Sequence, residues 1–203
     1  MVSNYKIFSG TSNKTLAKAI AHYLKKPLGK CNVGKFPNGE TRVEIKESVR
    51  GRDVFVIQPT SPPVNDNLME LILMIDAFRR ASANSITAVV PYFGYAKQDK
   101  KKSGREPISA SVVANLLQCA GMDRLVTLDL HAPQIEGYFT IPVENLAGVT
   151  LFEQQFKDFK DIVVVAPDAG GMKRARDLAN RINAKRLAVI DKYRPTYRSA
   201  SAM

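Results

Sequence analysis

Asp129 and His131 form the first pair of side chains that could do chemistry. They close the segment 124–131, whose apolar part, 124–130, is predicted to be a strand. Residues two apart in a strand point to the same face, so both side chains could meet one ligand. A carboxylate beside an imidazole can hold a metal or a phosphate, or transfer a proton. A purely structural Asp–His hydrogen bond is the alternative.

Asp168 is the second candidate. It stands between a predicted strand, 162–166, and two glycines, Gly170 and Gly171, that open a predicted helix, 171–182. Glycines let the backbone approach a ligand closely, and a helix N-terminus carries partial positive charge that suits an anion. Asp168 could hold a divalent cation on that anion. The alternative is that Asp168 only caps the helix.

A tight turn offers a third candidate. The sequence Phe-Pro-Asn-Gly-Glu, residues 36–40, lies between two strand-like segments, and Asn-Gly accepts the positive φ that a hairpin turn demands. Phe36 could stack on a flat base, while Asn38 or Glu40 could read its amino group. Many such hairpins are only turns.

Two basic segments follow predicted strands. The polar loop 92–107 is about sixteen residues long, which exceeds the usual connection in a compact domain and favours a functional loop. It carries Lys97 and Gln98, a candidate phosphate clamp, although a run of charge is commonly a solvated face. Lys192 and Arg194 follow the last predicted strand, 187–191, and form either a second phosphate contact or a basic surface tail.

Strands and helices alternate along nearly the whole chain. Further strands are predicted at 5–8, 53–58 and 85–91, and further helices at 16–24, 68–78, 108–119 and 145–159. This alternation predicts an α/β fold with a mostly parallel sheet covered on both faces. Right-handed crossovers then bring the loops that follow the strands to one sheet edge, where ligands bind in such folds.

The helix predicted at 68–78 is apolar almost all round, and Asn65 or Asp66 could cap it. Such a helix is covered on two sides, either inside one subunit or between subunits. Gly121 should end the helix 108–119. Pro142 and the polar turn before residue 145 could mark a domain boundary.

Composition narrows the function classes. The chain has 203 residues, 45% of them hydrophobic, and a net charge of +11 from 30 Lys and Arg against 19 Asp and Glu. The length allows one large or two small domains, and the apolar content excludes wholesale disorder. The charge favours a polyanionic partner: nucleic acid, an acidic membrane or a phosphorylated small molecule.

Two of these partners are disfavoured. Trp is absent and no nucleic-acid-binding signature accompanies the basic segments, so we expect no nucleic acid partner. The most apolar stretch, 68–78, is interrupted by Glu70 and Asp76 and is too short to span a bilayer, so we expect no membrane partner. Cys31 and Cys119 lie too far apart in sequence for a Cys-x-x-Cys site, which indicates a reducing, cytoplasmic location.

Nine segments, taken together and in order, resemble the ribose-phosphate pyrophosphokinases, the synthetases of 5-phosphoribosyl 1-diphosphate. They are FPNGE, RDVFVIQPT, NDNLMELILMIDAFRRASA, VVPYFGYAKQDKK, REPISASVVANLL, TLDLHAPQIEGYF, IPVENL, VVVAPDAGGMKRA and AVIDKYRP. The resemblance implies two phosphoribosyltransferase-type parallel-sheet domains: an N-terminal domain, 1–145, and the start of a C-terminal one, 146–203, incomplete here. It implies transfer of the β,γ-diphosphoryl group of Mg-ATP to O1 of ribose 5-phosphate, which releases AMP.

The resemblance also implies roles for particular residues and a homo-oligomer, typically a hexamer. Residues of the turn would contact adenine, often in a neighbouring subunit: Phe36, Asn38, Gly39 and Glu40. Lys97 and Gln98 would line the nucleotide, and His131 and Asp168 would hold Mg-ATP through its metal or its phosphates. Lys192 and Arg194 would be the basic pair of a mobile catalytic loop.

The sequence departs from the family pattern in three places. Lys97 replaces the usual Arg, so a point charge stands where a planar fork is common, and Asn38 replaces the commoner Asp. The acidic, Thr- and Gly-containing loop that cradles ribose 5-phosphate would lie beyond Met203, so we expect little activity from these 203 residues alone. The chain is then either part of a full-length enzyme or a short non-catalytic nucleotide-binding or assembly subunit. A polyanion-binding protein without a reaction is the third possibility.

Overall fold

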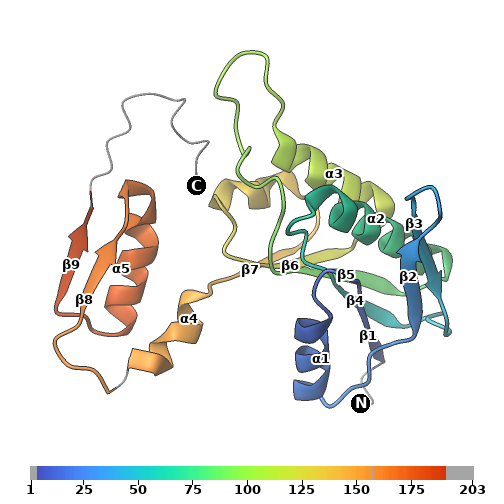
Figure 1. The fold of residues 1–203 in the computed structure, drawn as a ribbon, viewed down its shortest axis with the longest axis horizontal. Coiled ribbons are helices and arrows are strands. Elements are labelled where there is room, and N and C mark those ends of the chain that lie inside the picture. Colours follow the sequence, from blue (N-terminus) through green and yellow to red (C-terminus); the bar gives the residue numbers. More distant parts are fainter. Residues whose placement is uncertain (1–3, 157, 191–203) are drawn as a thin grey trace. The chain divides into compact units, whose positions relative to one another are not determined.

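The structure is a computed structural model that describes residues 4–156 and 158–190 (Figure 1). Its contacts divide the chain into two compact units, Met1–Leu146 and Ala147–Met203. Each unit has its own sheet and its own hydrophobic core, and each is described by itself below.

A five-stranded parallel sheet forms the centre of the first unit. Its strands run in the order β1 (Tyr5–Ser9), β4 (Asp53–Ile57), β5 (Ser85–Val90), β6 (Arg124–Leu128) and β7 (Val143–Leu146). The three inner strands are apolar runs, as expected for a sheet buried on both faces. The predicted α/β class and the parallel sheet are confirmed.

Helices and a hairpin cover this sheet (Figure 1). The helices α2 (Val64–Arg80) and α3 (Ser109–Ala120) share one core with the antiparallel hairpin β2 (Cys31–Lys35) and β3 (Thr41–Ile45). A smaller cluster, with Ile7, Ala17 and Ile57 at its centre, packs α1 (Lys14–Tyr23) against β1 and β4.

The long helix α2 is buried mainly inside its own unit. Leu71, Met74, Ile75 and Phe78 have no exposed surface, whereas Met69 is 50% exposed. The helix begins at Val64 after Pro63, so Asn65 and Asp66 occupy its first turn and the prediction that one of them caps it was wrong. Pro63 lacks the side-chain acceptor of a capping residue, and no side-chain cap is formed there.

Gly121 ends α3 as predicted. Its φ of 112° is left-handed, and its N–H donates to carbonyl groups of the last helical turn. A Cβ at this position would lie 2.6 Å from the Cδ of Arg79, so packing as well as conformation favours glycine.

The predicted helix 145–159 was wrong. Residues 143–146 instead form β7, which extends the sheet by pairing with Leu125–Leu128. The helical part that follows is short: α4 (Val149–Phe152) and the 3-10 turn η2 (Glu153–Phe156). The pairing of β7 with β6 supplies hydrogen bonds and burial of Val143 against the core, which local periodicity does not reveal.

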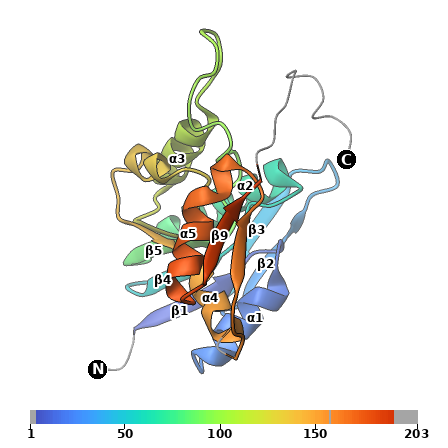
Figure 2. The same cartoon turned by 90° about the vertical axis from the view of Figure 1, so that its left-hand side faces the viewer.

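In the described part of the second unit, the helix α5 (Met172–Arg181) packs on a two-stranded parallel sheet (Figure 2). After α4 and η2, its described elements are β8 (Val163–Ala166), the 3-10 turn η3 (Ala169–Gly171), α5 and β9 (Arg186–Val189). Val164 and Ala166 pack against Ala175 and Ala179 of α5. Across residues 4–156 and 158–190, no helix is both long and apolar enough to cross a bilayer.

Candidate functional site

Two loops leave the sheet side by side. Because β5 and β6 pair in parallel, the segment after Val90 and the segment after Leu128 begin at the same sheet edge. The first segment carries Lys97 and Gln98, and the second carries His131 and the 3-10 helix η1 (Pro133–Tyr138). This carboxyl edge is where open α/β sheets bind ligands.

Asp99 joins the two loops. Its side chain is buried, and its Oδ2 accepts a hydrogen bond of 2.5 Å from Nε2 of Gln134, while the hydroxyl of Tyr138 donates to its backbone carbonyl. The buried rings of Phe93 and Phe139 add an edge-on contact between the loops, with centroids 5.9 Å apart. The segment that contains Lys97 and Gln98 is therefore held against η1, which starts two residues after His131.

Lys97 and His131 both face solvent. Within the described part of the chain, neither side chain forms an ion pair or a hydrogen bond, so both can turn to a ligand. An ammonium and an imidazole on adjoining loops can neutralise and hydrogen-bond the oxygens of a phosphate chain.

Asp129 departs from the prediction. The strand β6 ends at Leu128, and Asp129 has a left-handed φ of 47°. The alternation of a strand is broken there, so the inference that Asp129 and His131 share a strand face was wrong. The backbone N–H of Asp129 donates to the carbonyl of Leu146 at 2.9 Å, which fixes the start of the second loop on β7.

Gln98 stabilises the start of α3 through its hydrogen bonds. Its carbonyl accepts from the N–H of Ala110 at 3.2 Å, and its Oε1 accepts from the hydroxyl of Ser109. The N-cap residue of α3, Ile108, supplies no side-chain acceptor, and the carbonyl of Gln98 satisfies one backbone donor, the Ala110 N–H, that the helix start leaves open. The Nε2 group of Gln98 remains a donor for a ligand.

Hydrogen bonds fix the first loop both before and after its basic residues. At its start, the N–H of Gly94 donates to the hydroxyl of Thr60 at 2.7 Å, and a Cβ on Gly94 would lie 2.8 Å from the Thr60 carbonyl oxygen. At its far end, Glu106 accepts from the N–H groups of Lys102 and Ser103 at 2.8 and 3.2 Å. These backbone hydrogen bonds hold the pKa of Glu106 below its ordinary value.

The predicted hairpin turn is present and has a three-residue loop. Phe36 and Glu40 close a three-residue loop, in which the N–H of Gly39 donates to the carbonyl of Phe36 at 2.9 Å and Gly39 has a φ of 88°. Asn38 Oδ1 accepts from the N–H of Glu40 at 3.2 Å, so this side chain stabilises the turn. The hairpin itself is confirmed.

The turn stays apart from the two loops within the described chain. Phe36 is 46% exposed, and its ring contacts the guanidinium of Arg42, 6.0 Å from the ring centre. No hydrogen bond, ion pair or ring contact among the described residues links residues 36–40 to Lys97, Gln98 or His131.

Asp168 belongs to the second unit, where it begins the helical segment. Its Oδ1 accepts from the N–H of Gly171 at 2.8 Å, which is the capping role that the sequence left open. The second carboxylate oxygen remains for a ligand. Lys192 and Arg194 lie outside the described residues.

Sequence reasoning missed Asp99, Gln134 and Tyr138. Asp99 stood within a run of lysines, where an acidic residue is unremarkable. Gln134 and Tyr138 lie in the 3-10 helix η1, where residues four apart do not share a face, so their nearness to His131 in the sequence was the available signal.

The sequence is similar to the sequences of one protein family. Residues 5–121 match the family model of the N-terminal domain of ribose phosphate pyrophosphokinase. The ribose-phosphate pyrophosphokinase of Thermotoga maritima is 55% identical over 196 residues, covering 94% of this chain and 62% of the relative. The one of Clostridium tetani is 56% identical over 195 residues, covering 94% and 61%.

A solved structure is similar as well. The crystal structure of phosphoribosylpyrophosphate synthetase from Mycobacterium smegmatis matches with a TM-score of 0.88 and 43% identity, covering 94% of this chain and 65% of that one. The chain thus spans about 62% of the length of the curated relatives it matches. Since the family model covers more than half of the chain, the chain belongs to the ribose-phosphate pyrophosphokinase family.

Proposed function

We propose that the chain supplies the nucleotide-binding part of a ribose-phosphate diphosphokinase. The reaction transfers the β,γ-diphosphoryl group of Mg-ATP to O1 of ribose 5-phosphate and gives 5-phosphoribosyl 1-diphosphate and AMP. One observation carries the proposal: in a chain of this family, Asp99 fastens together two loops that present Lys97 and His131 at one sheet edge.

In the proposed complex, these loops hold the phosphate chain of ATP. Lys97 neutralises phosphate charge, His131 donates a hydrogen bond to a phosphate oxygen, and Nε2 of Gln98 adds a neutral donor. Phosphoryl transfer depends mainly on positioning and on charge stabilisation. Loops held together by the hydrogen bond between Asp99 and Gln134 suit positioning and charge stabilisation better than free loops do.

Magnesium is part of the proposal. Among the described residues, no group of three His, Cys, Asp or Glu side chains could enclose a metal ion. Mg²⁺ commonly binds through one or two carboxylates together with water and substrate phosphates, and the second oxygen of Asp168 fits that donor set. His131 suits a phosphate oxygen better than Mg²⁺, which prefers oxygen ligands. When bound, the ion would neutralise charge on the transferred group.

The hairpin turn is proposed to serve a neighbouring copy. Phe36, Asn38, Gly39 and Glu40 form an exposed tip, and no hydrogen bond, ion pair or ring contact among the described residues joins it to the loops that carry Lys97 and His131. An exposed aromatic ring on a protruding turn can stack on adenine in another subunit of a homo-oligomer. We also propose that Lys192 and Arg194 contact the transferred group.

The proposed location is the cytoplasm. Cys31 and Cys119 are free thiols in the structure, which suits a reducing compartment.

Calorimetric titration with Mg-ATP tests the proposed site. The double variant Lys97→Ala/His131→Ala should bind at least about tenfold more weakly, because two contacts to charged phosphate are lost. Lys18→Ala is the control. It removes an exposed cation from α1, on the sheet face opposite α2 and α3, and should leave the affinity for Mg-ATP unchanged. Equal affinity of the double variant and the unchanged chain would reject the site.

A further inference from the structure

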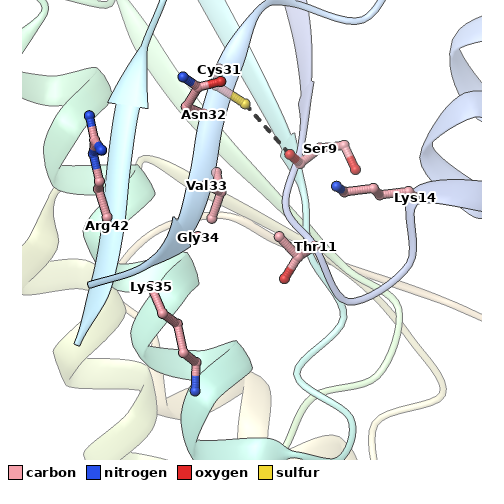
Figure 3. A pocket seen from close by; sticks show the side chains of 9 residues that line it. All are labelled: Ser9, Thr11, Lys14, Cys31, Asn32, Val33, Gly34, Lys35 and Arg42. Carbon is pink, nitrogen blue, oxygen red and sulfur yellow. Dashed lines mark hydrogen bonds between the residues drawn. The ribbon is translucent and has the colours of Figure 1, made fainter. Parts of the chain in front are cut away.

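A hollow of about 310 Å³ lies between the turn that follows β1 and the outer edge of β2 (Figure 3). Three of the residues that line it are cations, Lys14, Lys35 and Arg42, and none is acidic. The remaining lining residues are Ser9, Thr11, Cys31, Asn32, Val33 and Gly34. This charge balance favours an anionic ligand.

The edge of β2 offers backbone donors to this hollow. In an antiparallel pair, hydrogen-bonded and non-hydrogen-bonded residues alternate, and the bonds of Phe36 with Glu40 and of Lys46 with Lys30 set the phase. The N–H groups of Val33 and Lys35 therefore point away from β3. Neither group donates to another described residue, and both residues line the hollow.

Lys14 approaches from the opposite wall. Its side chain extends from the first turn of α1 toward β2 and ends near Ser9 (Figure 3). It forms no ion pair with any residue that the structure describes. Burial, with a smaller contribution from Glu70, raises the pKa of Cys31, and the charge of Lys14 acts in the opposite direction, which agrees with an ammonium close to β2.

Lys35 and Arg42 flank the hollow. Lys35 pairs with Asp66 at 2.9 Å and Arg42 with Glu44 at 3.3 Å, and all four side chains are 40–55% exposed. Exposed pairs of this kind are weak, so neither cation is withheld from a ligand by its partner.

The turn that forms the other wall is rigid. Two buried side chains hold it: Gln58 Oε1 accepts from the N–H and hydroxyl of Ser12, and Glu70 accepts from the N–H and hydroxyl of Thr11. A wall that is already ordered loses little conformational entropy when a ligand binds.

The hollow is separate from the loops proposed to bind ATP. In the sheet, β4 and β5 lie between β1 and β6, which places the end of β1 roughly 14 Å from the end of β6. A ligand in the hollow would touch the base of the hairpin and the β1–α1 turn instead.

We propose that this hollow is a second, phosphate-binding site. The phosphate group of a small molecule would accept hydrogen bonds from Lys14 Nζ and from the N–H groups of Val33 and Lys35. It would thereby connect the hairpin to the β1–α1 turn. The site involves none of the residues to which ATP contacts are assigned above.

Amide NMR of the 203-residue chain tests the proposal with inorganic phosphate as the probe. At constant ionic strength, the Val33, Gly34 and Lys35 signals should shift saturably. The variant Lys14→Gln should weaken this binding at least about tenfold, because it removes a charge-assisted contact. Lys14 is exposed, so the variant should fold like the unchanged chain, which its remaining signals verify.

The matched control is Lys18→Gln, which removes an exposed cation one turn further along α1 and should titrate like the unchanged chain. Equal weakening by Lys14→Gln and Lys18→Gln, or shifts spread over all basic surfaces, would overturn the proposal. An absence of phosphate-dependent shifts at residues 33–35 would also overturn it. A parallel titration with glycerol 3-phosphate separates the sources: tighter binding than inorganic phosphate assigns the site to organic phosphates, and equal or weaker binding assigns it to free phosphate.

Discussion

The buried carboxylate of Asp99 accepts a hydrogen bond of 2.5 Å from Nε2 of Gln134, thirty-five residues further along the chain. The two residues come from the loops that follow β5 and β6, and their contact fixes where Lys97 and His131 stand. This contact stabilises a single arrangement, because separating the partners leaves the buried Asp99 carboxylate without the donor of Gln134.

A double-mutant cycle measures the coupling free energy between Asp99 and Gln134. Gln134→Ala should lower the free energy of unfolding by about 1–3 kcal/mol, because it leaves the buried Asp99 carboxylate without its side-chain donor. Asp99→Ala should cost less, because the exposed Gln134 amide can turn to water, and the double variant should show a coupling energy on the order of 1 kcal/mol in urea unfolding. Additive effects of the two single variants would mean that the contact contributes nothing.

Gly10, the glycine of the β1–α1 turn, should tolerate no side chain without a loss of stability. A Cβ there would lie 2.1 Å from Gln58 Oε1 and 2.6 Å from Glu70 Oε1, both in buried side chains. Gly10→Ala should therefore cost about 1–3 kcal/mol of unfolding free energy through overpacking. Gly34→Ala is the matched control, since no atom lies within 4 Å of its added Cβ, and it should cost far less. Equal urea midpoints for the two variants would contradict the described packing.

The far end of the first loop should respond to pH through Glu106. Hydrogen bonds from the N–H groups of Lys102 and Ser103 lower its pKa, so the ionised form is favoured in the folded chain. This contribution is fully present above the ordinary pKa of a glutamate and is lost as the pH falls through the lowered value. The amide signals of Lys102 and Ser103 should shift over that window in NMR, and Glu106→Gln should abolish the titration. A transition at or above the ordinary glutamate pKa would show that these bonds do not form.

The variant Phe36→Ala distinguishes a role in nucleotide binding by a neighbouring subunit from a role in folding. The ring is 46% exposed and contacts Arg42, so Phe36→Ala should change the unfolding free energy by no more than about 1 kcal/mol. We expect weaker Mg-ATP binding at concentrations where light scattering shows an assembled chain. Unchanged affinity of the assembled variant would exclude the proposed contact with adenine.

Much of the fold followed from local patterns. The inner strands are short apolar runs, Gly121 ends α3, and residues 36–40 form the turn of a hairpin. These features depend on neighbouring residues alone, so periodicity and turn chemistry were sufficient to predict them.

The errors arose where distant segments decide the structure. The strand β7 exists because Val143–Leu146 pairs with β6, and this pairing outweighs the helical pattern that begins at residue 145. Likewise, the left-handed φ of 47° at Asp129 takes this residue out of the strand, directly after the last pair between β6 and β7. The loops of the candidate site were predicted to meet at the sheet edge, but the residue that joins them, Asp99, depends on a partner thirty-five positions away and has no local signature.

An amide NMR map of Mg-ATP binding tests the central claim most directly. If the loops after β5 and β6 hold the nucleotide, the signals of residues 94–99 and 131–134 should shift saturably with Mg-ATP, and these shifts should be reduced in Lys97→Ala. Signals on the far side of the first unit, such as Lys18 and Lys25, should stay in place. Saturable shifts elsewhere in the chain, with residues 94–99 and 131–134 unchanged, would contradict the account.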